Sequence, residues 1–174
     1  GVMQHHGAIL HNAAGAAEVL VNDFGIGDEE VFLSFLPLSH AYEHSGGQFL
    51  PIMVGAQINY SEGLEKLVSN IEETRPTIMV VVPRLFEVIR ARMIKSVEKQ
   101  GKLANWMLNQ ALRVGEKDYE RRMGVLDRPV DLILDKLFRP KIQKRFGGRM
   151  KALVSGGAPL NPEIGVFFHS IGLT

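Results

Sequence analysis

Cysteine is absent from the 174 residues, which excludes disulfide bonds and metal sites built on thiolates. No apolar run approaches the length that a bilayer crossing needs, and no charged segment followed by an apolar one opens the chain as a secretory signal would. A reducing cytoplasm is therefore the expected compartment. Hydrophobic residues make up 45% of the sequence and charged residues 22%, which is the mixture of a folded protein.

Neither end of the sequence has a terminal signal. Gly1-Val2-Met3 runs directly into a polar segment that contains histidine, and residues 171–174 have the apolar pattern of a strand that is just beginning. A domain usually closes with a cap or a polar tail. We therefore expect residues 1–174 to be an internal fragment of a larger domain in a longer protein.

The formal net charge of +1 conceals an uneven distribution of charge. Residues 84–151 contain about 18 basic and 8 acidic side chains, and the rest of the chain contains about 2 and 11. Such a basic block suits a polyanionic partner, such as a phosphate group, an acidic lipid or a nucleic acid, although solvated helix faces give the same pattern. Aromatic residues do not alternate with the basic ones, so nucleic acid is not expected to bind.

Four short apolar runs predict the strands of a sheet, at residues 31–37, 56–60, 77–82 and 150–154. Continuous apolar runs are typical of strands that are covered on both faces, as in a parallel sheet. Between the second and third runs, apolar residues recur at helical spacing, at Leu64, Leu67, Val68 and Ile71. This spacing predicts a helix over residues 63–76 that completes a βαβ crossover.

Helical patterns fill most of the remaining sequence, at residues 7–21, 44–54, 83–99, 103–123, 130–146 and 161–169. The last of these begins with Asn161 as its N-cap and Pro162 just inside it, which is a strong start signal. The expected fold class is α/β: a partial parallel-sheet subdomain with βαβ crossovers, and a long helical insertion at residues 84–150 between the third and fourth strands.

The segment LPLSHAYEH, residues 36–44, follows the first predicted strand. Open parallel sheets bind ligands at the carboxyl ends of their strands, so these polar and aromatic side chains are candidates to line a crevice. His40 and His44 have the spacing of two metal ligands on one helix face, but no third ligand is apparent, so no metal site is expected. The alternative is that His40 is a hydrogen-bonded structural histidine. Gly46-Gly47 either admits a neighbouring helix or leaves a channel open.

The segment SGGAPL, residues 155–160, follows the fourth predicted strand and precedes the Asn161 cap. Its small residues allow a flat ligand to approach the backbone close to a helix N-terminus. The pattern fits a nucleotide base or sugar better than a phosphate, because the GxxxxGK[ST] phosphate loop is absent. A strand-to-helix turn that needs glycine only for its geometry would have the same sequence.

Together these segments resemble the adenylate-forming superfamily of acyl-CoA synthetases, luciferases and peptide-synthetase adenylation domains. The similarity runs along the whole chain in four segments, which are residues 1–5, 36–44, 72–87 and 155–160. Gly1 resembles the last glycine of the family's phosphate loop. LPLSHAYE and the long insertion are most similar to the long-chain fatty-acid–CoA ligases.

The resemblance implies two groups of binding residues. His40 would lie near the acyl carboxylate, with three residues along the acyl tunnel, namely Tyr42, His44 and Gly47. Four residues would pack their backbone against adenine, namely Gly156, Gly157, Ala158 and Pro159. The resemblance also implies that the magnesium-binding glutamate and the catalytic lysine follow Thr174, so the chain alone is expected to be inactive.

The implied parent enzyme is a ligase that uses ATP, Mg²⁺ and coenzyme A to activate a fatty acid through an acyl-adenylate. It would be cytoplasmic, with its basic insertion touching the inner face of an anionic membrane. Two alternatives stay open on the sequence. One is an acyl-AMP ligase that passes the acyl group to an acyl-carrier protein, and the other is a non-catalytic module that binds acyl chains or membrane surfaces.

Overall fold

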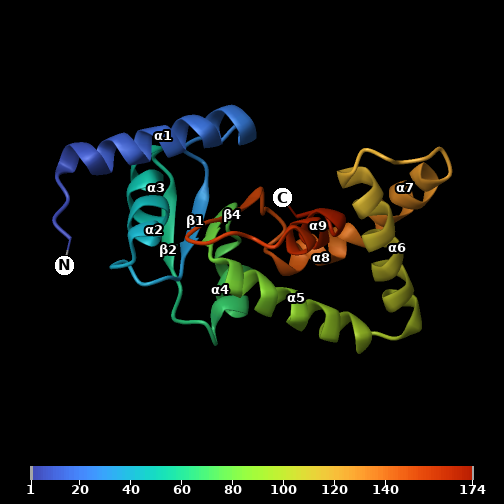
Figure 1. Cartoon of the computed structure of the whole chain (residues 1–174). Helices are drawn as coiled ribbons and strands as arrows, with labels where there is room; N and C mark the ends of the chain where they lie inside the picture. Colours follow the sequence, from blue (N-terminus) through green and yellow to red (C-terminus); the bar gives the residue numbers. More distant parts are fainter. Residues whose placement is uncertain (1, 174) are drawn as a thin grey trace. The chain divides into compact units, whose positions relative to one another are not determined.

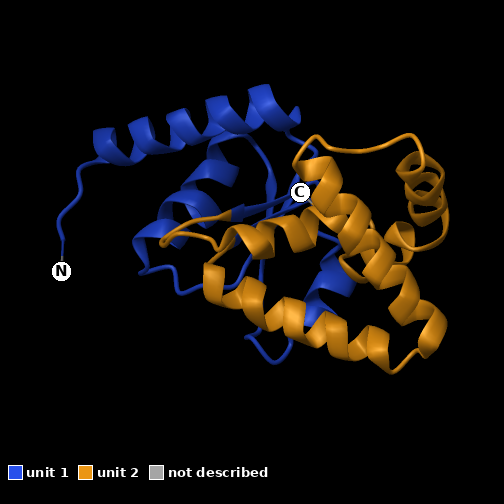
Figure 2. Cartoon of the chain, turned by 45° about the vertical axis from the view of Figure 1, so that its right-hand side comes forward, with its two compact units in different colours: residues 1–80, 149–154 blue, residues 81–148, 155–174 orange. Residues whose placement is uncertain are grey.

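The computed structural model describes residues 2–173 and divides into two compact units, which Figure 2 shows in separate colours. Unit 1 comprises Gly1–Val80 and Arg149–Val154, and unit 2 comprises Val81–Gly148 and Ser155–Thr174. Both units are therefore discontinuous in sequence. Among the described helices, none combines the length and the apolar character that a bilayer crossing requires.

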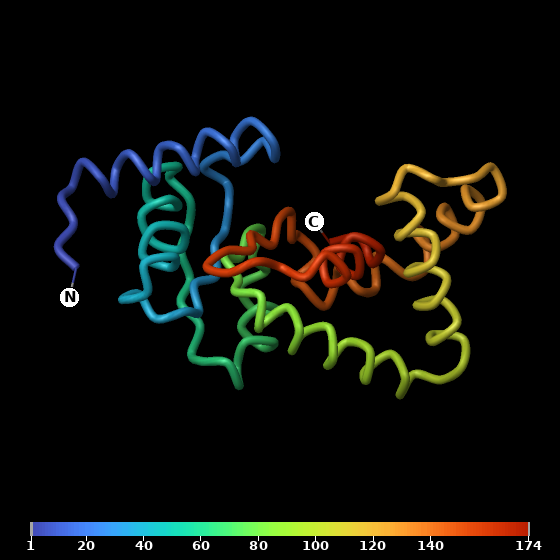
Figure 3. Tube along the Cα trace, viewed as in Figure 1, coloured from blue at the N-terminus to red at the C-terminus, as the bar shows by residue number. Residues whose placement is uncertain are grey.

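A four-stranded parallel sheet forms the centre of unit 1, with the order β2-β1-β3-β4 (Figure 1). Its strands are β1 (Val31–Ser34), β2 (Gln57–Tyr60), β3 (Ile78–Val81) and β4 (Ala152–Ser155). The first strand pairs in parallel with both β2 and β3, with Phe32 opposite Ile58 and Ile78. Residues 149–154 then return to add β4 beside β3, as the trace shows (Figure 3). The Lys151 N–H donates to the Thr77 carbonyl. The expected parallel sheet is confirmed.

The strands differ in how far their faces are covered. All residues of β1 and β3 are buried, as the apolar runs predict. The edge strand β2 is half exposed, and Tyr60 is 54% exposed. The prediction of two covered faces is therefore wrong for β2, because a strand's place in the sheet depends on pairing between distant segments and not on its own composition.

The first helix, α1 (His6–Phe24), runs three residues further than the expected helix at 7–21. Asn22-Asp23 does not end it. It ends at Gly25, which adopts the left-handed conformation at φ 60° and donates its N–H to the Val21 carbonyl, the geometry in which glycine is favoured. A core cluster beneath it comprises Leu20, Ile26, Phe32, Leu50 and Ile78.

Three short helical elements link β1 to β2 in one continuous run. They are α2 (Ala41–Glu43), the π-helical segment η1 (His44–Phe49) and α3 (Leu50–Met53). The expected helix at 44–54 is thus present, but it starts earlier and contains a wide turn. Such π-helical turns are rare in proteins, and those that occur often lie at functional sites.

The crossover helix α4 (Leu67–Thr74) is shorter than the expected helix over residues 63–76. Leu67 and Ile71 are buried, whereas Leu64 lies before the helix and is 59% exposed. The chain turns at Arg75, where φ is 48°, directly before Pro76. The apolar spacing predicts the helix, but it places the start too early, and Val68, which the spacing assigns to the buried face, is 52% exposed.

Unit 2 consists mainly of helices. They are α5 (Pro83–Glu98), α6 (Lys102–Tyr119), α7 (Asp127–Leu137), α8 (Arg139–Arg145) and α9 (Pro162–Ser170). The single helix expected at 130–146 is wrong, because the chain breaks at Phe138, while Pro129 is accommodated inside the first turn of α7. The start of α9 is confirmed, since the Asn161 side chain accepts a hydrogen bond from the Glu163 N–H at 2.9 Å.

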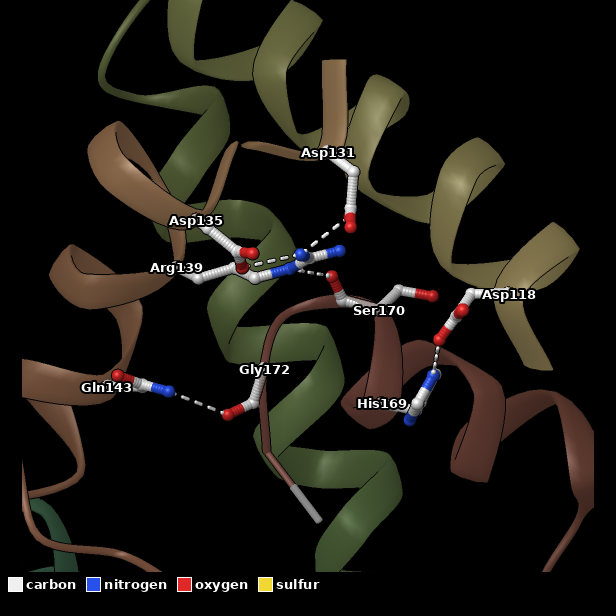
Figure 4. A network of polar contacts seen from close by, with 8 residues as sticks. All are labelled: Asp118, Asp131, Asp135, Arg139, Gln143, His169, Ser170 and Gly172. Carbon is white, nitrogen blue, oxygen red and sulfur yellow. Dashed lines mark hydrogen bonds and ion pairs between the residues drawn. The ribbon is translucent and has the colours of Figure 1, made fainter. Parts of the chain in front are cut away.

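The break at Phe138 places Arg139 in a polar network (Figure 4). One guanidinium nitrogen of Arg139 lies 2.7 Å from Asp131 and 2.6 Å from Asp135 of α7. Its Nε donates to the Ser170 carbonyl at 3.0 Å. A single side chain therefore joins α7, α8 and the end of α9.

The strand expected from residue 171 onward is wrong for the described residues. Ile171 and Gly172 form a turn after α9, with Gly172 at φ 84°. Ile171 and Leu173 are nevertheless buried, so their apolar character reflects burial in unit 2. Thr174 lies outside the described residues.

Candidate functional site

His40 lies at the end of the loop that follows the carboxyl end of β1, where it caps α2. Its N–H donates to the Pro37 carbonyl at 2.9 Å, which tightens the loop. Its Nδ1 accepts a hydrogen bond from the Tyr42 N–H at 3.2 Å. With Nδ1 acting as acceptor, a neutral imidazole carries its proton on Nε2. The imidazole is exposed, so this arrangement presents a hydrogen-bond donor to a ligand.

Tyr42 joins α2 to the end of β4. Its hydroxyl donates to the Val154 carbonyl at 2.8 Å. Burial, together with the nearby charge of Glu43, raises the pKa of Tyr42 to about 12. The phenol therefore stays protonated, and its one proton is committed to the backbone of β4.

Glu43 is a functional candidate that sequence reasoning missed. Its side chain is 0% exposed, and it accepts hydrogen bonds from the Ser34 hydroxyl and the Phe35 N–H. Burial raises the pKa of this carboxyl, although those two hydrogen bonds and the electrostatic effect of the His40 ring oppose the shift. The available signal was an acidic residue followed four positions later by glycine, Gly47.

His44 and Gly47 lie on the π-helical segment η1. The His44 ring packs edge-on against Phe49, with the ring centroids 4.7 Å apart. Gly47 is buried, and a Cβ at this position would overlap the Glu43 carboxylate. This contact favours the interpretation of Gly47 as a packing glycine, and its place on an acyl tunnel stays a prediction.

The candidate nucleotide turn belongs to unit 2. The Gly156 N–H donates to the Val81 carbonyl at 3.2 Å, and Gly157 adopts φ 81°. Residues Gly157, Ala158 and Pro159 are exposed. The hydroxyl oxygen of Ser155 is buried and has no partner among the described residues. The turn therefore presents small side chains and backbone to a ligand, and the positive φ of Gly157 favours glycine at that position.

The eight predicted site residues thus fall into two groups. The acyl group, His40, Tyr42, His44 and Gly47, lies together in unit 1, and the adenine group, Gly156 to Pro159, lies together in unit 2. Within residues 2–173, no cluster of three or more His, Asp or Glu side chains could hold a metal ion. Gly1, assigned by resemblance to the end of the phosphate loop, lies outside the described residues.

Comparison with known proteins identifies the family. The sequence profile of the AMP-binding enzymes matches residues 1–174. The chain belongs to the AMP-binding enzyme family. This confirms the resemblance to adenylate-forming enzymes, and the observed architecture confirms the expected α/β class.

Similar curated proteins include the peroxisomal long chain acyl-CoA synthetase 6 of Arabidopsis thaliana, which is 32% identical over 166 residues. That match covers 94% of this chain and 22% of the relative. Fatty acyl-CoA synthetase A of Dictyostelium discoideum is 31% identical over 171 residues, covering 98% of this chain and 24% of the relative. The chain thus spans about a quarter of the length of these relatives.

A solved structure with the same fold is the A domain of the carboxylic acid reductase of Segniliparus rugosus, with a TM-score of 0.51 and 22% identity. The match covers 92% of this chain and 23% of that one. At this level of identity the likeness concerns the fold alone.

Proposed function

We propose that this AMP-binding chain is part of a long-chain fatty-acid–CoA ligase. The observation that carries the proposal is His40, an exposed imidazole held in one tautomer at the carboxyl end of a central parallel strand. That is where parallel sheets bind ligands. The similarity to a long chain acyl-CoA synthetase and to a fatty acyl-CoA synthetase supports a fatty acid as the substrate.

The proposed reaction has two steps. The fatty-acid carboxylate attacks the α-phosphorus of ATP, which forms acyl-AMP and releases pyrophosphate. The thiolate of coenzyme A then attacks the acyl carbonyl carbon, and AMP leaves. The first step replaces a poor leaving group with a good one, so that the thioester can form.

The proposed role of His40 is to donate its Nε2 hydrogen to the substrate carboxylate or to the carbonyl oxygen of the adenylate. A hydrogen bond to a charged group contributes about 1.5–3 kcal/mol. Tyr42, His44 and Gly47 would lie along the acyl chain. Because the Tyr42 hydroxyl is already bonded to Val154, its ring and not its hydroxyl would face the acyl chain.

The backbone of the turn Gly156 to Pro159 is proposed to pack against adenine. Its small side chains and the left-handed Gly157 suit the close approach of a flat base. The described residues do not provide a set of magnesium ligands. We therefore assign no Mg²⁺ contact to this chain, and Mg²⁺ would be bound elsewhere in the full-length ligase.

Contact with an anionic membrane is a further part of the proposal. Helix α7 exposes three apolar side chains, Leu132, Ile133 and Leu137. Its acidic residues take part in ion pairs with Arg139, Lys117 and Arg113. The exposed charge of this helix therefore comes from basic side chains such as Arg128 and Lys136. Exposed apolar side chains together with basic ones favour binding to an anionic lipid surface.

The test is an assay of the full-length ligase with palmitate, ATP and Mg²⁺. We expect palmitate-dependent release of pyrophosphate, and palmitoyl-CoA once coenzyme A is added. Product formation with an acyl-carrier protein but not with coenzyme A would support the carrier-protein alternative. Absence of acid-dependent pyrophosphate release would contradict the ligase proposal.

A further inference from the structure

The Glu43 carboxyl closes the loop that carries His40. The loop begins after Ser34, the last residue of β1, and ends where α2 begins. Glu43 is the last residue of α2. The Glu43 side chain reaches back across the loop and accepts hydrogen bonds from the Ser34 hydroxyl and the Phe35 N–H. One side chain therefore joins the start of the loop to its end.

Few other contacts join the two ends of this loop. Residues 37–40 are exposed. The His40 N–H bonds to the Pro37 carbonyl and its Nδ1 to the Tyr42 N–H, and both contacts are local, within three residues. They shape the end of the loop but do not fix it to the sheet. The Tyr42 hydroxyl ties α2 to β4 through the Val154 carbonyl, and the Glu43 side chain ties it to β1, the strand from which the loop departs.

Gly47 provides the space that the Glu43 carboxyl occupies. A Cβ on Gly47 would overlap Glu43 Oε1, whereas one on Gly46 would meet only the Val80 side chain at 3.3 Å. The wide turn of η1 begins immediately after Glu43. The glutamate and the glycine thus form a matched pair, in which the side chain of one fills the space left empty by the other.

Burial raises the pKa of the Glu43 carboxyl, against the effect of its hydrogen bonds to Ser34 and Phe35. Its exposed fraction is 0%, and its Oε2 has no partner among the described residues. The titratable groups facing it are His40 and Tyr42, while Ser34 of β1 contributes its hydroxyl and the next residue, Phe35, its N–H. An isolated buried charge is costly, whereas a neutral acid that accepts two hydrogen bonds is tolerated.

We infer that Glu43 is a positioning residue for His40, and that glycine at position 47 leaves the space that the Glu43 carboxyl occupies. Glu43 does not touch the substrate, because it is fully buried. It acts by holding the loop, and so sets the place of the His40 imidazole. This inference rests on the proposed ligase function.

The chain offers a matched control in Glu30, the other buried glutamate next to β1. Glu30 is 2% exposed, immediately precedes Val31, and pairs with Lys151. It lies at the amino end of the strand, away from His40. Glu30→Ala therefore removes a buried, hydrogen-bonded carboxyl of the same size, at the end of β1 opposite the His40 loop.

The experiment compares variants of the full-length ligase in palmitate-dependent pyrophosphate release. We expect Glu43→Ala to lower kcat at least tenfold with little change in the KM for ATP. Glu43→Gln retains an acceptor oxygen, so its kcat should stay within threefold of wild type and its pH profile should coincide with the wild-type profile. Glu30→Ala should lower the melting temperature and leave kcat within threefold.

Gly47→Ala supplies an independent comparison. In the wild-type background its Cβ displaces the Glu43 carboxyl, so kcat should fall about as far as in Glu43→Ala. In the Glu43→Ala background the methyl group enters vacated space, so it should lower kcat by a much smaller factor than in the wild-type background. If the effect of Gly47→Ala depends in this way on the residue at position 43, the two residues interact directly.

Each outcome has a distinct meaning. A wild-type enzyme without acid-dependent activity refutes the proposed ligase function. An active wild type with an equally active Glu43→Ala refutes the positioning role, as does a Glu30→Ala that loses as much kcat as Glu43→Ala. An equal loss from Gly47→Ala in both backgrounds refutes the seating of Glu43. If Glu43→Ala does not fold, Glu43→Gln and Gly47→Ala decide: the inference fails if Gly47→Ala retains the wild-type kcat.

Discussion

The Glu43 carboxyl links stability to pH with a definite sign. Its pKa in the folded protein is raised by burial above the unfolded value of about 4.3. As the pH rises through this window, the unfolded chain releases its proton first, so the free energy of unfolding falls until the folded-state pKa is passed. A glutamine at this position has no proton to lose.

We therefore predict that the melting temperature of Glu43→Gln, minus that of the wild type, increases as the pH rises. Thermal unfolding of both proteins between about pH 4 and about pH 8 measures the difference. The gap should be smallest at the acid end and widen toward neutral pH. A gap that narrows with rising pH would mean that Glu43 is stabilised as the anion.

His40 is the residue on which the proposed chemistry depends most directly. Loss of one hydrogen bond to a charged group, at about 1.5–3 kcal/mol, corresponds to a rate reduction of roughly tenfold to a hundredfold. We predict that His40→Ala slows adenylate formation by that factor in the full-length ligase. Because the imidazole is exposed, the melting temperature should change little. A large fall in melting temperature with normal kinetics would identify His40 as a structural residue instead.

At the scale of elements, α6 and α9 pack closely where Gly115 meets Ser170. A Cβ on Gly115 would lie 2.5 Å from the Ser170 Cα, which is backbone and cannot rotate away. We predict that Gly115→Ala lowers the free energy of unfolding by about 1–3 kcal/mol, the range for an overpacked contact.

Gly15 is the matched control for this prediction. It lies in the exposed face of α1, and a Cβ there would meet nothing within 4 Å. Gly15→Ala should therefore raise the free energy of unfolding by about 0.5–1 kcal/mol, because alanine is the better helix former. Urea unfolding measures both variants. If the two substitutions shift stability in the same direction, the close contact at Ser170 is not what sets the effect.

Elements with local signals could be predicted from the sequence, and elements set by distant contacts could not. Asn161 and Pro162 define the start of α9 because a cap needs only its immediate neighbours. The break at Phe138 has only Pro140, in the first turn of α8, as a local signal. It coincides with the contacts of Arg139 to Asp131, to Asp135 and to the Ser170 carbonyl, 31 residues away. The half-exposed faces of β2 likewise follow from its place at the edge of the sheet.

The candidate site shows the same division. His40 stands out because it lies in a run of polar and aromatic residues directly after an apolar segment. Glu43 resembles an ordinary acidic residue of a helix, because its burial depends on the Ser34 hydroxyl nine residues earlier and on the missing side chain of Gly47. Such partnerships appear only once the chain is folded.

At the scale of the whole molecule, the basic charge of unit 2 predicts salt-sensitive binding to anionic lipid. Each Lys or Arg near such a surface contributes about 1 kcal/mol. Replacing Arg128 and Lys136 of α7 by Gln should weaken sedimentation with vesicles rich in phosphatidylserine and leave adenylate formation unchanged. Replacing Lys66 of unit 1 by Gln is the control and should have a smaller effect. Binding that is equal at low and high salt would exclude an electrostatic surface.

The 174-residue chain alone is predicted to be catalytically inert. Adenylyl transfer depends on Mg²⁺ and on cationic groups at the developing phosphate charge, and the described residues include no cluster that could hold a metal ion. Incubation with palmitate, ATP and Mg²⁺ should release no more pyrophosphate than a blank without protein. Turnover above that blank would show that the chain already contains a complete active site.

Unit 1 joins two separate stretches of chain, because residues 149–154 add β4 to a sheet whose other strands lie before residue 82. At a synthesis rate of about 5–20 residues per second, roughly 3–14 seconds separate the emergence of β3 from that of β4. During that interval the backbone groups of β3 that later pair with β4 lack that partner, and an unpaired strand edge can pair with another chain. Closing the intervening loop costs about 4 kcal/mol of chain entropy. Translation therefore exposes an apolar strand edge for seconds, and neighbouring ribosomes on one messenger are where copies of this chain are most at risk of pairing with each other.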